Sequence, residues 1–117
     1  MKYEEIEDWK KLAKEEKYEE ATKSLLYEMG MNLMRVHNLY SDVKYDEKEK
    51  WYISIGSSLF LKDCPIIYEQ FEALVRELEL IDIKINESKD DIIIKYAYDK
   101  ALASRKKAKR IISKLKL

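Results

Sequence analysis

The sequence predicts an all-α fold: a compact bundle of four or five helices whose last two form a long antiparallel hairpin. There are only two Gly and one Pro in 117 residues, too few for the many tight turns of a β-sandwich or barrel. Apolar residues recur at spacings of three and four in three long segments, which is the period of one helix face. The length suits one hydrophobic core, so we expect a single helical domain over residues 1–117.

The first half of the chain is predicted to contain three helices, from Tyr3 to Glu15, from Tyr18 to Tyr40 and from Asp46 to Leu61. The second has the clearest pattern, because its apolar stripe steps by four and three through Thr22, Leu26, Met29, Leu33, Val36 and Tyr40. Met29, Met31 and Met34 lie within six residues, and Met31 is off this stripe. Methionine packs adaptably, so a partner groove here is a minor alternative to core filling.

The strongest helical pattern runs from Pro65 to Asn86. Its apolar stripe is an unbroken heptad repeat of Ile67, Phe71, Leu74, Leu78, Ile81 and Ile85. Proline suits the first turn of a helix, because its missing N–H has no partner there. We expect Asp63 or Cys64 to cap this helix.

Residues 80–98 admit an alternative, a β-hairpin that would make the fold α+β. Ile81, Ile83 and Ile85 alternate with polar residues, and β-branched residues favour strands. We favour helix, because Ser88 and Asp91 have the spacing of a capping box. Helical spacing also continues along a last helix, from Lys89 to Lys116, through Ile94, Ala97, Ala101, Ser104, Ala108, Ile112 and Leu115.

The last two helices are predicted to pack closely, because the second carries a stripe of small residues. With the turn at Asn86 to Asp90, Leu78 would face Tyr98 and Glu69 would lie near Lys107. A large side chain in place of an alanine of the stripe should cost about 1–3 kcal/mol.

The formal net charge is zero, but the charges are unevenly distributed. Residues 92–117 carry nine basic residues and one acidic residue, whereas the rest of the chain is acidic. Such asymmetry favours a polyanion as partner. We therefore predict that Arg105, Lys106, Lys109 and Arg110 form one exposed face of the last helix and contact nucleic-acid backbone without sequence preference.

No catalytic motif is evident, and we expect no enzyme activity, no metal and no cofactor. His37 and Cys64 are too few for a zinc site, and the only two glycines do not form a phosphate-binding loop. A single cysteine, a charged N-terminus and the lack of an apolar run of ~18 residues predict a cytoplasmic protein without membrane contact. Charge-rich, Gln-poor usage is typical of thermophiles.

These features predict a small non-enzymatic helical subunit of a larger complex, with a protein partner or self-association and with possible nucleic-acid contact. The alternative is a dedicated non-specific nucleic-acid-binding protein. The two differ in whether the cations of the last helix face carboxylates of the same chain. We also expect a homodimer or larger oligomer, because Ile111, Ile112 and Leu115 extend past the hairpin partner and need a surface to cover them, either the first helices or another chain.

Overall fold

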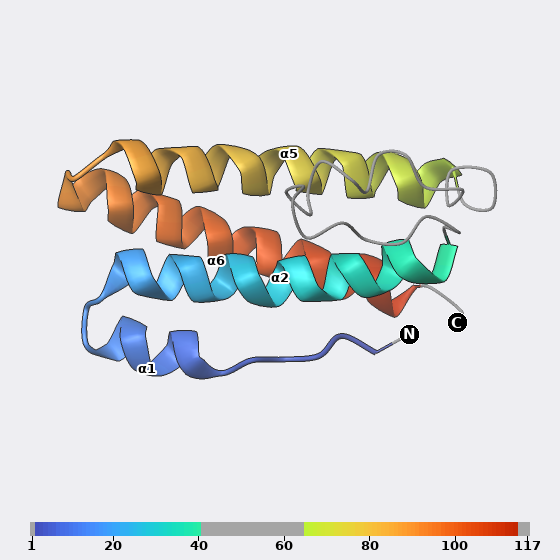
Figure 1. Cartoon of the computed structure of the whole chain (residues 1–117), viewed down its shortest axis with the longest axis horizontal. Helices are drawn as coiled ribbons and strands as arrows, with labels where there is room; N and C mark the ends of the chain where they lie inside the picture. The colour runs from blue at the N-terminus through green and yellow to red at the C-terminus, as the bar shows by residue number, and fades with distance from the viewer. Residues whose placement is uncertain (1, 41–64, 115–117) are drawn as a thin grey trace.

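The computed structural model describes residues 2–40 and 65–114, with side chains described for residues 2–36 and 69–114. It contains α1 (Asp8–Lys14), α2 (Tyr18–Tyr40), α5 (Pro65–Glu87) and α6 (Asp91–Ser113) (Figure 1). The all-α prediction is confirmed for this part of the chain. The β-hairpin alternative is wrong, because residues 80–98 form the end of α5, a short turn and the start of α6. The predicted helix Asp46–Leu61 and the caps Asp63 and Cys64 lie outside the described residues.

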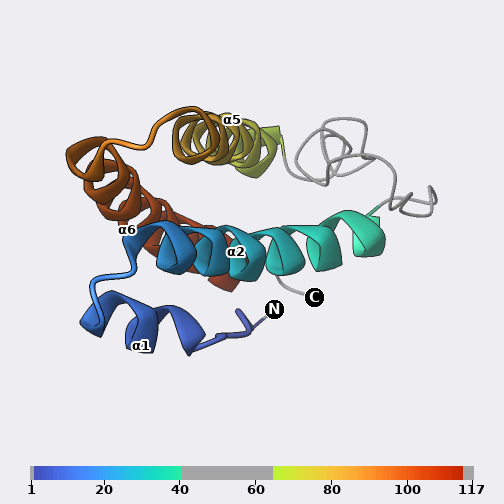
Figure 2. The same cartoon turned by 60° about the vertical axis from the view of Figure 1, so that its left-hand side comes forward.

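From one side of the molecule to the other the helices lie in the order α1, α2, α6 and α5, with α5 and α6 joined as an antiparallel hairpin at one end (Figures 1 and 2). Helix α6 packs against α5 on one side and against α2 on the other, and α1 covers α2. One cluster of buried side chains runs through all these contacts. The predicted apolar stripes supply it, because wherever side chains are described every residue of the three stripes is buried.

The small residues of α6 allow the close contact that the sequence predicts. Ala97, Ala101 and Ala108 are completely buried and Ser104 almost so. Ile111 and Ile112 are buried as well, within this chain. Of the two covers expected for these isoleucines, this chain or another, the structure shows the first, so they give no reason for an oligomer. Leu115 lies outside the described residues.

The predicted cap and register of the hairpin are wrong in detail. Asp90, not Ser88, is the N-cap of α6, and its carboxylate accepts a hydrogen bond from the backbone N–H of Ile92 at 2.8 Å. Opposite α6 stands Glu77, which accepts hydrogen bonds from Ser104 at 3.2 Å and Lys107 at 2.7 Å. The carboxylate that pairs with Lys107 is thus Glu77 and not Glu69, which was expected there.

The first helix begins later than predicted, at Asp8 and not at Tyr3. Side chains of α2 form hydrogen bonds with the backbone groups that would bond to each other in a longer helix. Asn32 accepts from the N–H of Glu4 and donates to its carbonyl, both at 2.8 Å. Glu28 accepts from the N–H of Ile6 at 2.7 Å. The segment before α1 is therefore held as an extended strap along α2 (Figure 1).

The turn between α1 and α2 is closed by Glu16, which has a positive φ of 59°. The N–H of Lys17 bonds to the carbonyl of Leu12 and that of Glu16 to the carbonyl of Ala13, the two bonds of a Schellman motif. Glycine is the residue that adopts this conformation without steric cost. Glu16 therefore carries local strain at this turn.

Candidate functional site

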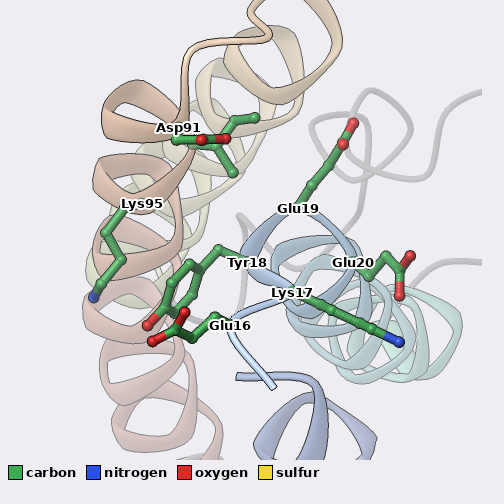
Figure 3. Close-up of a pocket in the computed structure, with 8 residues that line it drawn as sticks. Glu16, Lys17, Tyr18, Glu19, Glu20, Asp91 and Lys95 are labelled. Atoms are coloured by element: carbon green, nitrogen blue, oxygen red, sulfur yellow. The ribbon is translucent and has the colours of Figure 1, made fainter. Parts of the chain in front are cut away.

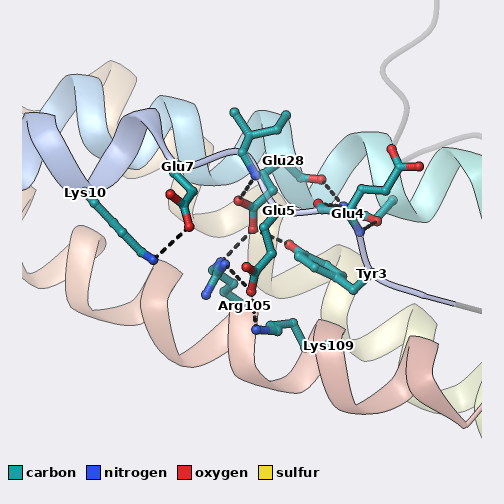
Figure 4. Close-up of polar contacts among 10 residues, drawn as sticks. Tyr3, Glu4, Glu5, Glu7, Lys10, Glu28, Arg105 and Lys109 are labelled. Carbon is teal, nitrogen blue, oxygen red and sulfur yellow. Dashed lines mark hydrogen bonds and ion pairs between the residues drawn. The ribbon is translucent and has the colours of Figure 1, made fainter.

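The four cations that the sequence assigns to polyanion binding do not share one exposed face. Only 12% of the Arg105 side chain is exposed, and its guanidinium points toward α2 and the N-terminal strap. Its Nε donates to Glu28 at 2.6 Å and its terminal nitrogen to Glu5 at 3.1 Å (Figure 4). Lys109, one turn further along α6, also donates to Glu5.

Glu28 is the centre of this arrangement, which we call the buried-glutamate cluster: Tyr3, Glu5, Glu28, Arg105 and Lys109. The Glu28 carboxylate is completely buried. One of its oxygens accepts from the Tyr3 hydroxyl at 2.7 Å and from Arg105, and the other accepts from the N–H of Ile6. A buried carboxylate needs such partners, because its charge has lost the stabilisation of water.

The environment shifts the pKa values of three members of the cluster. Burial, reinforced by the bond to Glu28, raises the pKa of the Tyr3 phenol far above its ordinary value. Burial by itself would lower the pKa of Arg105, but the bond to Glu28 and its charge outweigh it and raise the pKa. Lys109 and then Arg105 lower the pKa of Glu5. With these shifts, Arg105 and Glu5 are charged and Tyr3 is neutral at neutral pH, as expected in a structural network of ion pairs.

The other two predicted cations, Lys106 and Arg110, are exposed. Neither forms an ion pair with a carboxylate among the residues whose side chains are described. Lys107 lies beside them but pairs with Glu77 of α5. The carboxylates that pair with α6 thus come from the strap, from α2 and from α5, and within the described part of the chain they leave Lys106 and Arg110 without a partner.

A depression of about 400 Å³ lies where the turn before α2 meets the start of α6. Its carboxylates point in different directions, with Glu19 and Glu20 directed away from each other (Figure 3). Lys95 lies over the ring of Tyr18 at 4.9 Å and bonds to Asp99 at 2.7 Å. Among the described residues, no group of three or more His, Cys, Asp or Glu side chains has the arrangement of a metal site.

The largest gathering of exposed apolar side chains lies at the closed end of the α5–α6 hairpin. Seven large apolar side chains are exposed in the described part of the chain, and five of them are here: Leu80, Ile83, Ile92, Ile93 and Tyr96. We call these five residues the hairpin surface. Ile92 is 80% exposed and Leu80 is 61% exposed, which is unusual for residues of this size gathered in one place.

A groove of about 250 Å³ continues the hairpin surface along the line between the two helices. Leu80 and Tyr96 line it, together with Lys84 and Lys100. Both lysine amines lie over the Tyr96 ring, at 4.7 and 5.5 Å from its centroid. Neither amine is paired with a carboxylate among the described residues, so the groove has an apolar floor and two available cations.

The hairpin surface was not identified from the sequence, although a signal for it is present. Ile92, Ile93 and Ile94 are consecutive, and one face of a helix can bury only one of three such neighbours. The structure buries Ile94 and leaves the other two exposed. Ile83, another residue of the hairpin surface, belongs to the alternation of Ile81, Ile83 and Ile85 that favoured the alternative fold.

Comparison of the chain with protein-family models, with curated protein sequences and with solved structures finds no significant match. The surfaces of the chain itself are therefore the basis on which a function can be proposed. Among the helices of the described part, none combines the length and the apolar character that crossing a bilayer requires.

Proposed function

We propose that the protein is a non-enzymatic interaction subunit that assembles with another protein chain through the hairpin surface. The observation that carries this proposal is the concentration of exposed apolar residues at one place, five of the seven in the described part of the chain. Exposed apolar patches of this kind mark interaction sites in folded proteins, because leaving them in water is unfavourable.

The local structure supports a binding role for the hairpin surface. It stands on α5 and α6, which bury their stripes against each other and need no further cover on their inner faces. Tyr96 lines the groove with its ring beside two lysine amines, and tyrosine is enriched at protein interfaces. A rigid helical hairpin loses little conformational entropy on binding.

Site-specific photo-crosslinking in the cells that produce the protein tests this proposal. A photoreactive residue in place of Ile92 should give a discrete crosslinked product, because this side chain is 80% exposed at the proposed interface. The matched control is the same residue in place of Lys106, exposed on the same helix but away from the hairpin surface. The proposal fails if position 92 yields no product, or no more than position 106.

A second candidate function is contact with nucleic-acid backbone through α6. The favouring observation is that Lys106 and Arg110 are exposed without a carboxylate partner among the described residues. Arg105 and Lys109 are engaged by Glu5 and Glu28, so the contact would rest on about two phosphates and its affinity would fall with a log–log salt slope of about −2. Filter binding of single-stranded and duplex nucleic acid at two salt concentrations measures this slope.

A further inference from the structure

We infer that the partner of the hairpin surface is an acidic amphipathic helix of another protein, which lies along the groove between α5 and α6. This inference rests on the proposed function and adds the chemical class of the partner. Its basis is a groove whose floor is mainly apolar and whose walls carry cations that have no carboxylate partner in the described part of the chain.

The groove beside Leu80 and Tyr96 continues toward the open end of the hairpin. A second depression, of about 260 Å³, lies further along the line between α5 and α6. Both depressions are lined by Glu77 and Lys107, so they adjoin there, and the 2.7 Å ion pair of these two residues joins the helices. Tyr96 and Lys114, at the two ends of the α6 side, are eighteen residues apart, which is about 27 Å along the helix axis.

The floor of the groove is mainly apolar. It is formed by residues of the buried stripes: Leu74 and Ile81 of α5, and Ala97 and Ile111 of α6. Leu74 lies in one depression and Ile81 in the other, seven residues apart, which is about 10.5 Å or two turns of a helix. A helix lying in the groove can therefore place apolar side chains seven residues apart into the two depressions.

The walls of the groove are cationic, although the whole chain has equal numbers of basic and acidic residues. Five of the six charged residues that line the two depressions are basic: Lys84, Lys100, Lys107, Arg110 and Lys114. Glu77, the one carboxylate, pairs with Lys107, and the other four cations have no carboxylate partner among the described residues. Carboxylates beside the apolar stripe of a partner helix would pair with these cations, whereas a basic helix would be repelled.

The apolar floor favours a protein over nucleic acid as the occupant. The phosphates of a nucleic-acid backbone would contact the cations and leave the floor and Leu80, which is 61% exposed, without an apolar partner. An amphipathic helix covers the apolar residues with its own apolar face and places its carboxylates near the cations at the rim. This is the usual arrangement of a protein interface, with an apolar core and a polar rim.

Binding of two matched peptides to the purified protein tests this inference. Both are alanine-based helices of about 18 residues with two leucines seven residues apart, and they differ only in whether the flanking positions carry glutamate or lysine. By fluorescence anisotropy the glutamate peptide should bind about tenfold more tightly, and its affinity should fall as salt is raised. Equal binding of the two peptides, or no binding of either, overturns the inference.

Charge reversals locate the contact. Lys100→Glu and Arg110→Glu should each weaken binding of the glutamate peptide by about threefold or more, because each places a carboxylate in the wall of the groove. Lys106→Glu is the matched control, since Lys106 is exposed on the same helix and lines neither depression. If the control weakens binding as much, the peptide responds to the total charge of the protein and the inference is wrong.

Competition with a short DNA duplex separates a protein site from a polyanion site. The duplex should not displace the glutamate peptide at about 150 mM salt, and displacement would show that the groove binds polyanions and would refute the inference. The crosslinking experiment distinguishes this failure from that of the proposed function. A crosslinked partner at position 92 together with equal binding of both peptides refutes the acidic helix alone, whereas the absence of a product at position 92 refutes the proposed function.

Discussion

Replacing Arg105 by Met should destabilise the fold severely, although this residue belongs to a run of cations at the end of the chain. The substitution keeps a side chain of similar length and removes the charge. The Glu28 carboxylate would stay completely buried, with the Tyr3 hydroxyl and the N–H of Ile6 as its remaining partners. A buried charge that has lost its counter-ion is unfavourable, because water cannot reach it.

The magnitude follows from the geometry. Arg105 Nε lies 2.6 Å from the Glu28 oxygen, which puts the charge centres about 4 Å apart and gives about 4 kcal/mol at an effective dielectric constant of 20. Measured losses on breaking buried pairs are about 3–5 kcal/mol. For a domain with about 5–15 kcal/mol of total stability this is a large fraction, and the melting temperature should fall by more than about 10 °C.

Urea denaturation followed by circular dichroism measures the loss, and two further variants assign it to the ion pair. Arg110→Met is the matched control, exposed on the same helix, and should shift stability by about 0.5 kcal/mol or less. Adding Glu28→Gln to Arg105→Met should recover at least half of the loss, because Gln removes the uncompensated charge while its oxygen still accepts from the N–H of Ile6 and its amide N–H can donate to the Tyr3 hydroxyl oxygen. A loss below about 1 kcal/mol for Arg105→Met would refute this reasoning.

Three more predictions concern stability, each measured by urea denaturation. Tyr3→Phe should make the free energy of unfolding fall less steeply as the pH rises in the alkaline range. Burial and Glu28 raise the folded pKa of Tyr3, so the stabilisation that this phenol contributes is complete below its unfolded pKa of about 10 and is lost as the pH rises above that value. If the free energy of unfolding of this variant falls above pH ~10 as steeply as that of the original protein, the prediction is wrong. Glu16→Gly should stabilise by up to about 1 kcal/mol, since φ is 59° there, and a loss would show that the Glu side chain matters more than the strain. Ala101→Leu should cost about 1–3 kcal/mol, because Ala101 is completely buried against α5 and α2, and a neutral result would mean a looser contact.

The elements with long periodic stripes could be predicted from the sequence, because periodicity reports which face of a helix is buried. Helix α5 begins at Pro65 as expected and ends at Glu87, one residue beyond the expected end. The strap before α1 could not be predicted in this way. Its conformation depends on Asn32 and Glu28, which lie more than twenty residues further along the chain and bond to its backbone.

The roles of the cations on α6 were only partly predictable for the same reason. The sequence shows that Arg105, Lys106, Lys109 and Arg110 are close together on one helix, but not which carboxylates approach them. Glu5 is 100 residues from Arg105 in sequence and 3.1 Å away in space. The density of cations in the sequence therefore predicts a larger surface for a polyanion than the described residues provide. The exposed isoleucines at the hairpin were not predicted to form a surface.

The most direct test of the central claim is the particle mass of the purified protein, measured by light scattering at about 50 mM salt with and without single-stranded and duplex nucleic acid. If the hairpin surface, which binds a protein chain, is the main interaction site, adding nucleic acid leaves the particle mass unchanged. A mass that stays at 14.1 kDa in protein alone and increases only when nucleic acid is added would contradict the account, and would make the exposed cations of α6 the functional surface instead.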